Sequence, residues 1–453
     1  MTAETFLSAW KALEAGGAFA GPPWLRELRR EAIARFAARG LPTPRDEEWK
    51  YTSVAPITAA GLDAAADGGG DEPAEEVLAP EVLAPEVLSG AWPRLVFVDG
   101  RYSPKLSAIG PLPRGARIES MGEALITDPD MLRPHLLEPG AGEDGFAALN
   151  AAFWRDGALL HVPAGTVMAE PVHLLFVTTG ATRRVEHPRS LVVLGAGSRA
   201  TLIESHVALG GDAPGLTNAT VDIDLGEGAV LQRYTVQRAS SAGFEIGRTR
   251  VRQAGGSSFR SCAVTFDGRL VRNETEVRLG GETASCALDG LFVIGGRQHV
   301  DTRTVVDHAA PRATSRQLYK GILDGRARGV FNGRVIVKPG AVGTDAHQTN
   351  KNLLLSDEVE VDSKPQLEIF ADDVKCSHGA ADGQVAEDGI FYLRSRGLDE
   401  TRARALLTLG FANEVLGRID IGPLRARLEA FLASRLDGGR VAAEPEPAGK
   451  DAA

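Results

Sequence analysis

The stretch DDVKCSHGAADG, residues 372–383, sets a cysteine and a histidine two residues apart among charged and small residues. If this stretch is extended, Cys376 and His378 project from the same face, because side chains alternate along a β-strand. A thiolate and an imidazole that point together make up half of the four donors that zinc or iron–sulfur ligation usually requires. The spacing leaves three interpretations open: half of a metal site, a catalytic pair, or a polar turn in which Cys376 packs in the core and His378 caps the turn at Gly379.

A second set of candidate residues lies in VDTRTVVDH, residues 300–308. Asp301, Arg303 and Asp307 could act as the carboxylates and the arginine of a β-helix enzyme that acts on polysaccharides. On a long solenoid such residues are usually solvated strand faces, and we favour that interpretation.

A third polar group lies in TDAHQTNKNLLL, residues 344–355. We expect His347, Asn350 and Asn352 to form a turn-stabilising ladder of side chains rather than a ligand set. Cys262 and Cys286 sit inside strand-like runs and are expected to be small buried apolar residues.

Several catalytic and nucleotide-binding motifs are absent from the sequence. It has no G-x-x-x-x-G-K-[ST] phosphate loop, and the glycine run at Gly195 lies between strand-like runs instead of opening a helix. The G-x-S-x-G, H-E-x-x-H and C-x-x-C patterns are missing as well. We therefore expect this chain to bind no nucleotide.

Composition excludes other classes of function. The chain has 453 residues and a formal net charge of −10, with both signs interspersed, so it offers no uniform basic face for nucleic acid. Its 3 cysteines are too widely separated for a disulfide framework, which indicates a reducing, cytoplasmic environment. The N-terminal residues lack the pattern of a signal peptide, and no apolar run approaches the roughly 18 residues of a membrane span.

The elements that must position these residues are mainly β. From residue 159 to residue 385, short β-rich runs alternate with glycine turns, and the turns at Leu194, Leu225, Gly255 and Gly280 recur at roughly 25–30 residues. Hairpin turns in a sandwich or barrel would come every 8–12 residues or so, with clear Asn-Gly or Asp-Gly pairs. The spacing favours a β-solenoid over a sandwich.

Helical periodicity flanks this β region. Apolar stripes predict two helices within residues 1–60, and Asp399 is placed to cap a helix in a C-terminal helical domain of residues 386–436. Residues 61–90, with their repeated EVLAP unit, are expected to be a flexible linker. Residues 91–158 are expected to form a mixed α/β entry region, residues 159–385 the solenoid core and residues 437–453 a disordered tail.

Three motifs resemble a known family. KPQLEIFADDVKCSHGA (364–380), EDGIFYLRSRGLDETRARALLTLGFANEVL (387–416) and LPTPRDEEWKYTSV (41–54) are similar to the SufB/SufD family of the SUF iron–sulfur cluster assembly system. The form KCSHGA resembles the SufD branch, whereas SufB-like chains tend to carry H-E-A at this place. One departure is ADGQ after KCSHGA, where the family more often has a threonine and a valine, and the EVLAP repeats are another.

The resemblance implies a fold and a function. It implies a right-handed parallel β-helix flanked by N-terminal and C-terminal helical regions, and a cytoplasmic scaffold subunit that is not an enzyme. The expected partners are SufB, through the β-helices, and the ATPase SufC, on the C-terminal helices, with a possible homodimer when SufB is lacking. A transient iron–sulfur cluster is expected at the SufB interface, with His378 as a metal ligand and Cys376 as its companion. The alternatives are the polysaccharide-acting enzyme and a homo-oligomeric binding module without a metal role.

Overall fold

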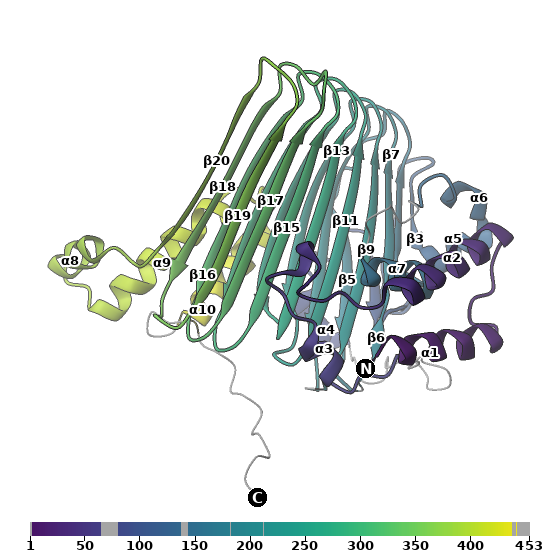
Figure 1. The fold of residues 1–453 in the computed structure, drawn as a ribbon, viewed down its shortest axis with the longest axis horizontal. Coiled ribbons are helices and arrows are strands. Elements are labelled where there is room, and N and C mark those ends of the chain that lie inside the picture. Colours follow the sequence, from purple (N-terminus) through teal and green to yellow (C-terminus); the bar gives the residue numbers. More distant parts are fainter. Residues whose placement is uncertain are drawn as a thin grey trace, which may run out of the picture.

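Two long, mostly parallel sheets enclose a common interior, and helices flank them at both ends of the chain (Figure 1). The computed structural model describes residues 2–64, 80–136, 144–181, 183–211, 213–436 and 441. Sheet I has the order β2 (Arg101–Tyr102), β1 (Arg94–Val98), β5 (Val172–Thr178), β8 (Arg199–Ala208), β10 (Val230–Arg238), β12 (Ser258–Asp267), β14 (Ser285–Ile294), β16 (Thr314–Leu323), β18 (Asp345–Leu354) and β20 (Lys375–Gly383). Sheet II has the order β19 (Glu360–Ile369), β17 (Arg328–Val337), β15 (His299–His308), β13 (Leu270–Leu279), β11 (Phe244–Gln253), β9 (Leu216–Leu225), β7 (Arg189–Leu194), β4 (Ala158–Val162) and β3 (Arg117–Ser120), and β6 (Val185–Glu186) pairs with β9.

The strand order is that of a β-solenoid. From β7 to β20, successive strands alternate between the two sheets, and each strand up to β18 pairs in parallel with the strand two places further along the chain. Parallel neighbours cannot be joined by tight hairpins, so a sandwich of hairpins is excluded. The predicted solenoid is confirmed.

Glycines make the stacked turns possible. Gly197 and Gly228 have φ angles of 65° and 64°, in the left-handed region that glycine adopts without steric cost. At Gly281 the reason is space, because an added Cβ would lie 2.0 Å from the backbone nitrogen of Gly255.

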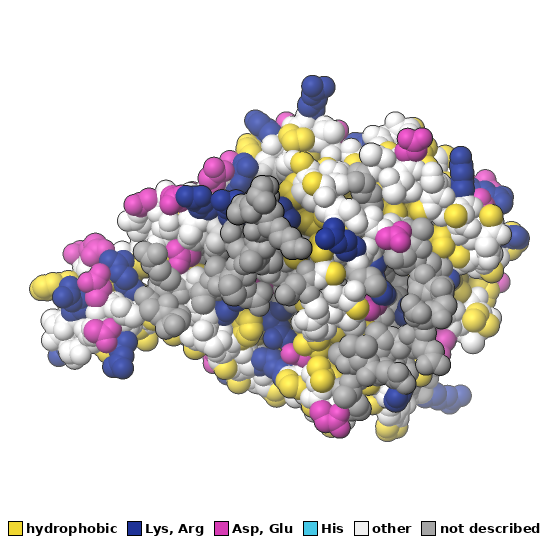
Figure 2. Space-filling view, turned by 90° about the horizontal axis from the view of Figure 1, so that it is seen from below, with side chains coloured by type: hydrophobic (Ala, Val, Ile, Leu, Met, Phe, Trp, Pro, Cys, Tyr) yellow, Lys and Arg dark blue, Asp and Glu magenta, His cyan; other side chains and the backbone are white. Residues whose placement is uncertain are grey.

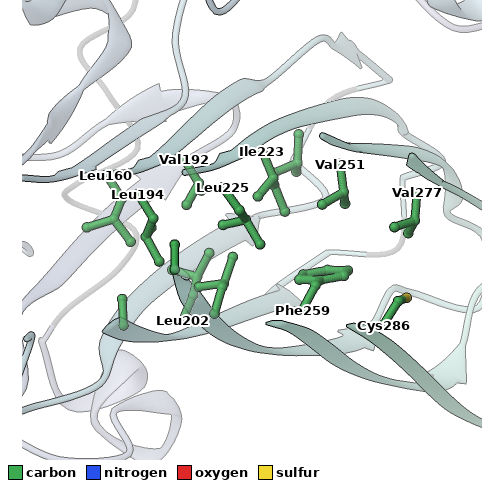
Figure 3. Packing of buried hydrophobic residues seen from close by; sticks show 14 of the residues in the cluster. Leu160, Val192, Leu194, Leu202, Ile223, Leu225, Val251, Phe259, Val277 and Cys286 are labelled. Carbon is green, nitrogen blue, oxygen red and sulfur yellow. The ribbon is translucent and has the colours of Figure 1, made fainter. Parts of the chain in front are cut away.

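Alternating apolar side chains fill the interior. Those that point between the sheets stack along the solenoid axis, as Figure 3 shows for Leu160, Val192, Leu194, Leu202, Ile223, Leu225, Val251, Phe259, Val277 and Cys286. Burial of such side chains is the main favourable term in folding. Cys286 belongs to this interior, and Cys262 is buried in a separate cluster beneath the C-terminal helices, so both are buried as predicted.

Helices cover the end of the solenoid where the chain begins (Figure 1). They are α1 (Ala3–Ala15), α2 (Pro23–Arg39), α5 (Met121–Thr127), α6 (Pro129–Leu132) and α7 (Gly145–Phe153). The short helices η1 (Glu47–Trp49) and α3 (Ala55–Ala59) belong to a segment that runs along the outer face of sheet II (Figure 1). The predicted apolar stripes of α1 and α2 face each other, and the rings of Phe6 and Phe36 pack edge to face at 5.6 Å.

Two C-terminal helices, α9 (Glu400–Leu416) and α10 (Gly422–Arg435), lie against the outer face of sheet I. A third, α8 (Glu387–Ser395), packs on α9 and protrudes from the body of the molecule (Figure 1). The carboxylate of Asp399 accepts a hydrogen bond of 2.8 Å from the backbone N–H of Arg402, which confirms the predicted N-cap. Apolar side chains of α9 and α10 share one buried cluster with the outer face of sheet I.

Part of the predicted flexible linker is packed structure. Residues 65–79 lie outside the described residues, but α4 (Pro80–Leu83) and η3 (Ala84–Glu86) follow them. Leu83 is buried, and Glu86 pairs with Arg238 on β10 and with Arg427 on α10. An apolar contact of Leu83 and two ion pairs of Glu86 thus attach this part of the segment to the solenoid and to α10. Most of the predicted tail, residues 437–440 and 442–453, also lies outside the described residues.

In the described part of the chain, no helix combines the length and apolar character needed to cross a bilayer.

Candidate functional site

The solenoid ends in two strands with one unpaired edge each. Among the described strands, β20 is the last of sheet I and pairs only with β18, while β19 is the last of sheet II and pairs only with β17. Both edges lie at the end opposite helices α1 and α2 (Figure 1). Within the described residues no further coil covers this end, which we call the open end (β19 and β20). Unpaired backbone N–H and C=O groups on an edge are a template for pairing with another chain.

Cys376 and His378 lie on the inward face of β20. In the register, Cys376 is beside Ala346 and His378 beside Gln348, and both of these neighbours on β18 are buried. Ser377, between them, is beside the partly exposed His347 on the outer face. The structure therefore brings the two predicted ligands to one face.

Cys376 and His378 differ in exposure. Cys376 is half-buried and packs against an apolar cluster that includes Val335, Val337 and Ala346, whereas His378 is exposed. Burial raises the pKa of the Cys376 thiol, and the carboxylate of Asp345 raises it further. The thiol therefore remains protonated near neutral pH unless a metal ion displaces its proton.

Within the described residues, Cys376 and His378 have no third histidine, cysteine, aspartate or glutamate beside them that could complete a metal site. Among the described residues, no group of three or more histidine, cysteine, aspartate or glutamate side chains is arranged to hold a metal ion. Tetrahedral ligation needs four donors, so any metal held here must take others from a second chain, from solvent or from residues of other types.

The outer face of β20 carries a separate polar chain. Nδ1 of His347 lies 2.5 Å from the hydroxyl of Ser377, and its Nε2 lies 2.8 Å from Asp345. Arg316 donates to Asp345 at 2.6 Å. His347 is therefore not part of the predicted ladder with Asn350 and Asn352, because it points outward and they point inward.

The inward amides form a network that sequence reasoning placed only in part. The Nδ2 group of Asn352 donates to Asn350 at 2.8 Å and to the carboxylate of Asp382 at 2.7 Å, and the hydroxyl of Ser363 donates to Asn350 at 2.7 Å. The predicted contact between the two asparagines is confirmed, but it lies inside the solenoid and not in a turn. Asp382 was missed, although its even spacing from His378 along β20 predicts the same face.

Asp301 and Arg303 bind side chains of the N-terminal segment. Asp301 is buried, pairs with Arg272 and accepts a hydrogen bond of 2.5 Å from Thr52. Arg303 pairs with Glu48 and with Glu274. These side chains are therefore neither the solvated faces we expected nor free groups for catalysis, while Asp307 lies apart from them, 4.0 Å from Lys338.

The C-terminal helices present exposed apolar side chains near the open end. Phe391 on α8 is 75% exposed, and Tyr392 and Leu406 are also largely exposed. Hydrophobic side chains are visible at the tip of the protruding helical region (Figure 2).

Comparison with known proteins identifies the family. Residues 176–411 match the SufBD core domain of SUF system FeS cluster assembly, and residues 20–174 match the SufBD protein N-terminal region. The chain is 32% identical over 413 residues to the iron–sulfur cluster assembly protein SufD of Escherichia coli, covering 90% of this chain and 93% of that protein. It is 34% identical over 416 residues to an iron–sulfur cluster assembly SufBD family protein of Synechocystis, covering 90% of each. The chain belongs to the SufBD family of the SUF iron–sulfur cluster assembly system, as its motifs predicted.

Proposed function

We propose that this chain is a SufD-like scaffold subunit that pairs with a SufB-like sister chain and helps to acquire iron for a nascent cluster. The observation that carries the proposal is the exposed imidazole of His378, beside Cys376, on the inward face of an unpaired edge strand. The iron and the cluster are cargo, and the chain supplies positions for them rather than a catalytic group.

The open end supports a partner that completes the site. Ile369 and Phe370, at the end of β19, are exposed apolar side chains beside the two free edges. A sister chain that pairs with these edges would cover the apolar side chains and bring further donors to His378. A second copy of this chain is the alternative occupant when the sister is lacking.

The C-terminal helices support docking of a separate ATPase. The sequence has no phosphate loop, so energy from ATP would have to come from a partner such as SufC. The exposed Phe391, Tyr392 and Leu406 on α8 and α9 offer an apolar surface of the kind that partner proteins cover.

The test is anaerobic co-expression with the SufB and SufC chains of the same organism. We expect a stable complex that carries iron and sulfide, and we expect His378→Ala to assemble normally but to lose most of the iron. His135→Ala removes a half-buried imidazole from the other end of the solenoid and should keep the iron content of the wild type. Equal iron content in the His378→Ala and wild-type complexes would exclude this role for His378.

ATPase docking is tested separately. The double variant Phe391→Ser, Tyr392→Ser changes only exposed side chains, so the chain should fold and pair with SufB while SufC is lost from the purified complex. Retention of SufC by this variant would place its docking surface elsewhere.

A further inference from the structure

A buried amide without a partner lies directly behind His378. Gln348 on β18 is 1% exposed, and neither its Nε2 nor its Oε1 atom has a hydrogen-bond partner among the described residues. Burying an unsatisfied polar group costs about 1–3 kcal/mol, so such a group in a folded protein calls for an explanation.

The opposite sheet makes room for this amide. Gly333 on β17 faces Gln348, and an added Cβ at Gly333 would lie 1.5 Å from Gln348 Nε2. Gly333 has no positive φ angle, so it is required here for space and not for its backbone conformation. Gln348 on β18 therefore fits only because β17 has a residue without a side chain opposite it.

Gln348 belongs to an inward row that leads to the open end. The register aligns Gln317 on β16, Gln348 on β18 and His378 on β20. The deepest member, Gln317, is partly satisfied, because its Oε1 accepts a hydrogen bond of 2.7 Å from Thr304. Gln348 is the member in which both amide atoms lack a partner within the described chain, and its ladder neighbour toward the open end is the exposed imidazole.

Building on the function proposed above, we propose that Gln348 and His378 form one binding site for a divalent cation. His378 supplies an imidazole nitrogen, and the Gln348 carboxamide oxygen binds the ion or a water molecule on it. Neighbouring strands lie about 4.8 Å apart, so adjacent inward side chains reach a common ion. Imidazole and carboxamide oxygen are both accepted by borderline divalent metals such as ferrous iron. Loading of the ion gives the Gln348 amide a partner that the described residues do not supply.

The experiment is a titration of the full-length protein with Co²⁺ alone, an air-stable stand-in for ferrous iron, followed by absorption spectroscopy and calorimetry. We expect Gln348→Leu to raise the Kd for Co²⁺ about 10-fold or more, the size of effect seen for groups that support metal ligands. The same variant should unfold at or above the wild-type temperature, because it removes an unsatisfied buried amide. Gln348→Glu, which keeps an oxygen donor, should bind Co²⁺ at least as tightly as the wild type.

The matched control is Gln317→Leu, which changes the deeper amide of the same row and should leave the Kd within about 2-fold, far below the 10-fold loss expected at a supporting group. If the branched leucine at position 348 prevents folding, Gln348→Met removes the amide with a more adaptable side chain.

The outcomes separate this inference from the proposed function. If His378→Ala loses Co²⁺ binding while Gln348→Leu binds as the wild type does, the role of Gln348 is overturned and that of His378 stands. The Gln348 amide is then satisfied by buried water. Unchanged binding in His378→Ala, or no binding by the wild type, overturns the site as a whole.

Discussion

The hydroxyl of Ser377 lies 2.5 Å from Nδ1 of His347 on the outer face of sheet I, while Cys376 and His378 on either side of Ser377 face inward. The contact joins β20 to β18, and through Asp345 and Arg316 it continues to β16. Side chains on the outer face thus hold an edge strand whose inner face carries the candidate ligands.

We predict that His347→Ala loosens β20 without unfolding the protein. Amide hydrogen exchange in residues 375–383 should accelerate, because among the described strands this one has a neighbour on one side only. The melting temperature should change little, since the lost contacts are partly exposed. Arg326→Ala removes a surface-exposed ion pair with Glu358 and should leave exchange in β20 unchanged. Equal exchange rates in the His347→Ala and wild-type proteins would contradict a role for the His347–Ser377 contact in holding β20.

A second prediction concerns the attachment of α9. The amine of Lys320, a residue 2% exposed, donates to Glu414 at 2.6 Å and to the carbonyl of Phe411 at 2.7 Å. Glu414→Ala leaves this buried ammonium poorly compensated and should lower the free energy of unfolding by about 1–3 kcal/mol, less than for a fully buried pair because Glu414 is partly exposed.

Urea unfolding followed by tryptophan fluorescence measures this change. Glu429→Ala, which removes an exposed i,i+4 pair with Arg425, should cost less than about 0.5 kcal/mol. Equal unfolding midpoints for the two variants would show that Lys320 does not depend on Glu414.

A third prediction concerns pH. Burial raises the pKa of Glu245 to about 7, against the opposing effect of a hydrogen bond of 2.7 Å from Gln237. Because the folded-state pKa lies above the ordinary value, the neutral form stabilises the fold below about pH 4.5, and this contribution is lost as the pH rises through 7. The loss amounts to about 3 kcal/mol at roughly 1.4 kcal/mol for each pH unit.

Glu245→Gln keeps the accepting oxygen and removes the titration. Its stability relative to the wild type should therefore increase by about 2 to 3 kcal/mol between pH 5 and pH 8, measured by urea unfolding at each pH. Buried histidines such as His187, whose pKa burial lowers to about 3, affect both proteins equally and cancel in the difference. Parallel stability curves for the two proteins would contradict the prediction.

A fourth prediction distinguishes a structural from a catalytic Asp301. Asp301→Asn weakens the compensation of the buried Arg272, which also stacks over Trp49 at 4.1 Å, and should cost about 3 kcal/mol. Asp307→Asn, at a more exposed pair, should cost less than about 1 kcal/mol. Thermal unfolding measures both, and cleavage of acidic polysaccharides by the wild type, abolished by either substitution at unchanged stability, would revive the enzymatic alternative.

Local patterns predicted much of the fold. Glycine turns at a regular spacing indicate stacked coils, an aspartate before an apolar stripe indicates the start of α9, and alternation along KCSHG places Cys376 and His378 on one face. The helix cap and the alternation depend on neighbours within a few residues, and the spacing of the turns is read directly along the chain, so the sequence alone reveals all three.

Contacts between coils were not predictable in this way. The neighbours Gln348 and His378, the pair Asn352 and Asp382, and the salt bridge between Asp301 and Arg272 each join residues one coil apart. Whether two such residues become neighbours depends on the register between their strands. Side-chain alternation, with its period of about two residues, fixes the face of each residue but not which residue of the next strand lies beside it.

By itself, the sequence determined that this protein is a stack of short strands and that its cysteine and histidine share a face, because side-chain alternation and glycine turns are local properties. Only the tertiary structure decided that this face lies at an open end, with a buried amide behind it. The exposure of Cys376 and His378 depends on the place of β20 at the edge of sheet I and on what covers that strand.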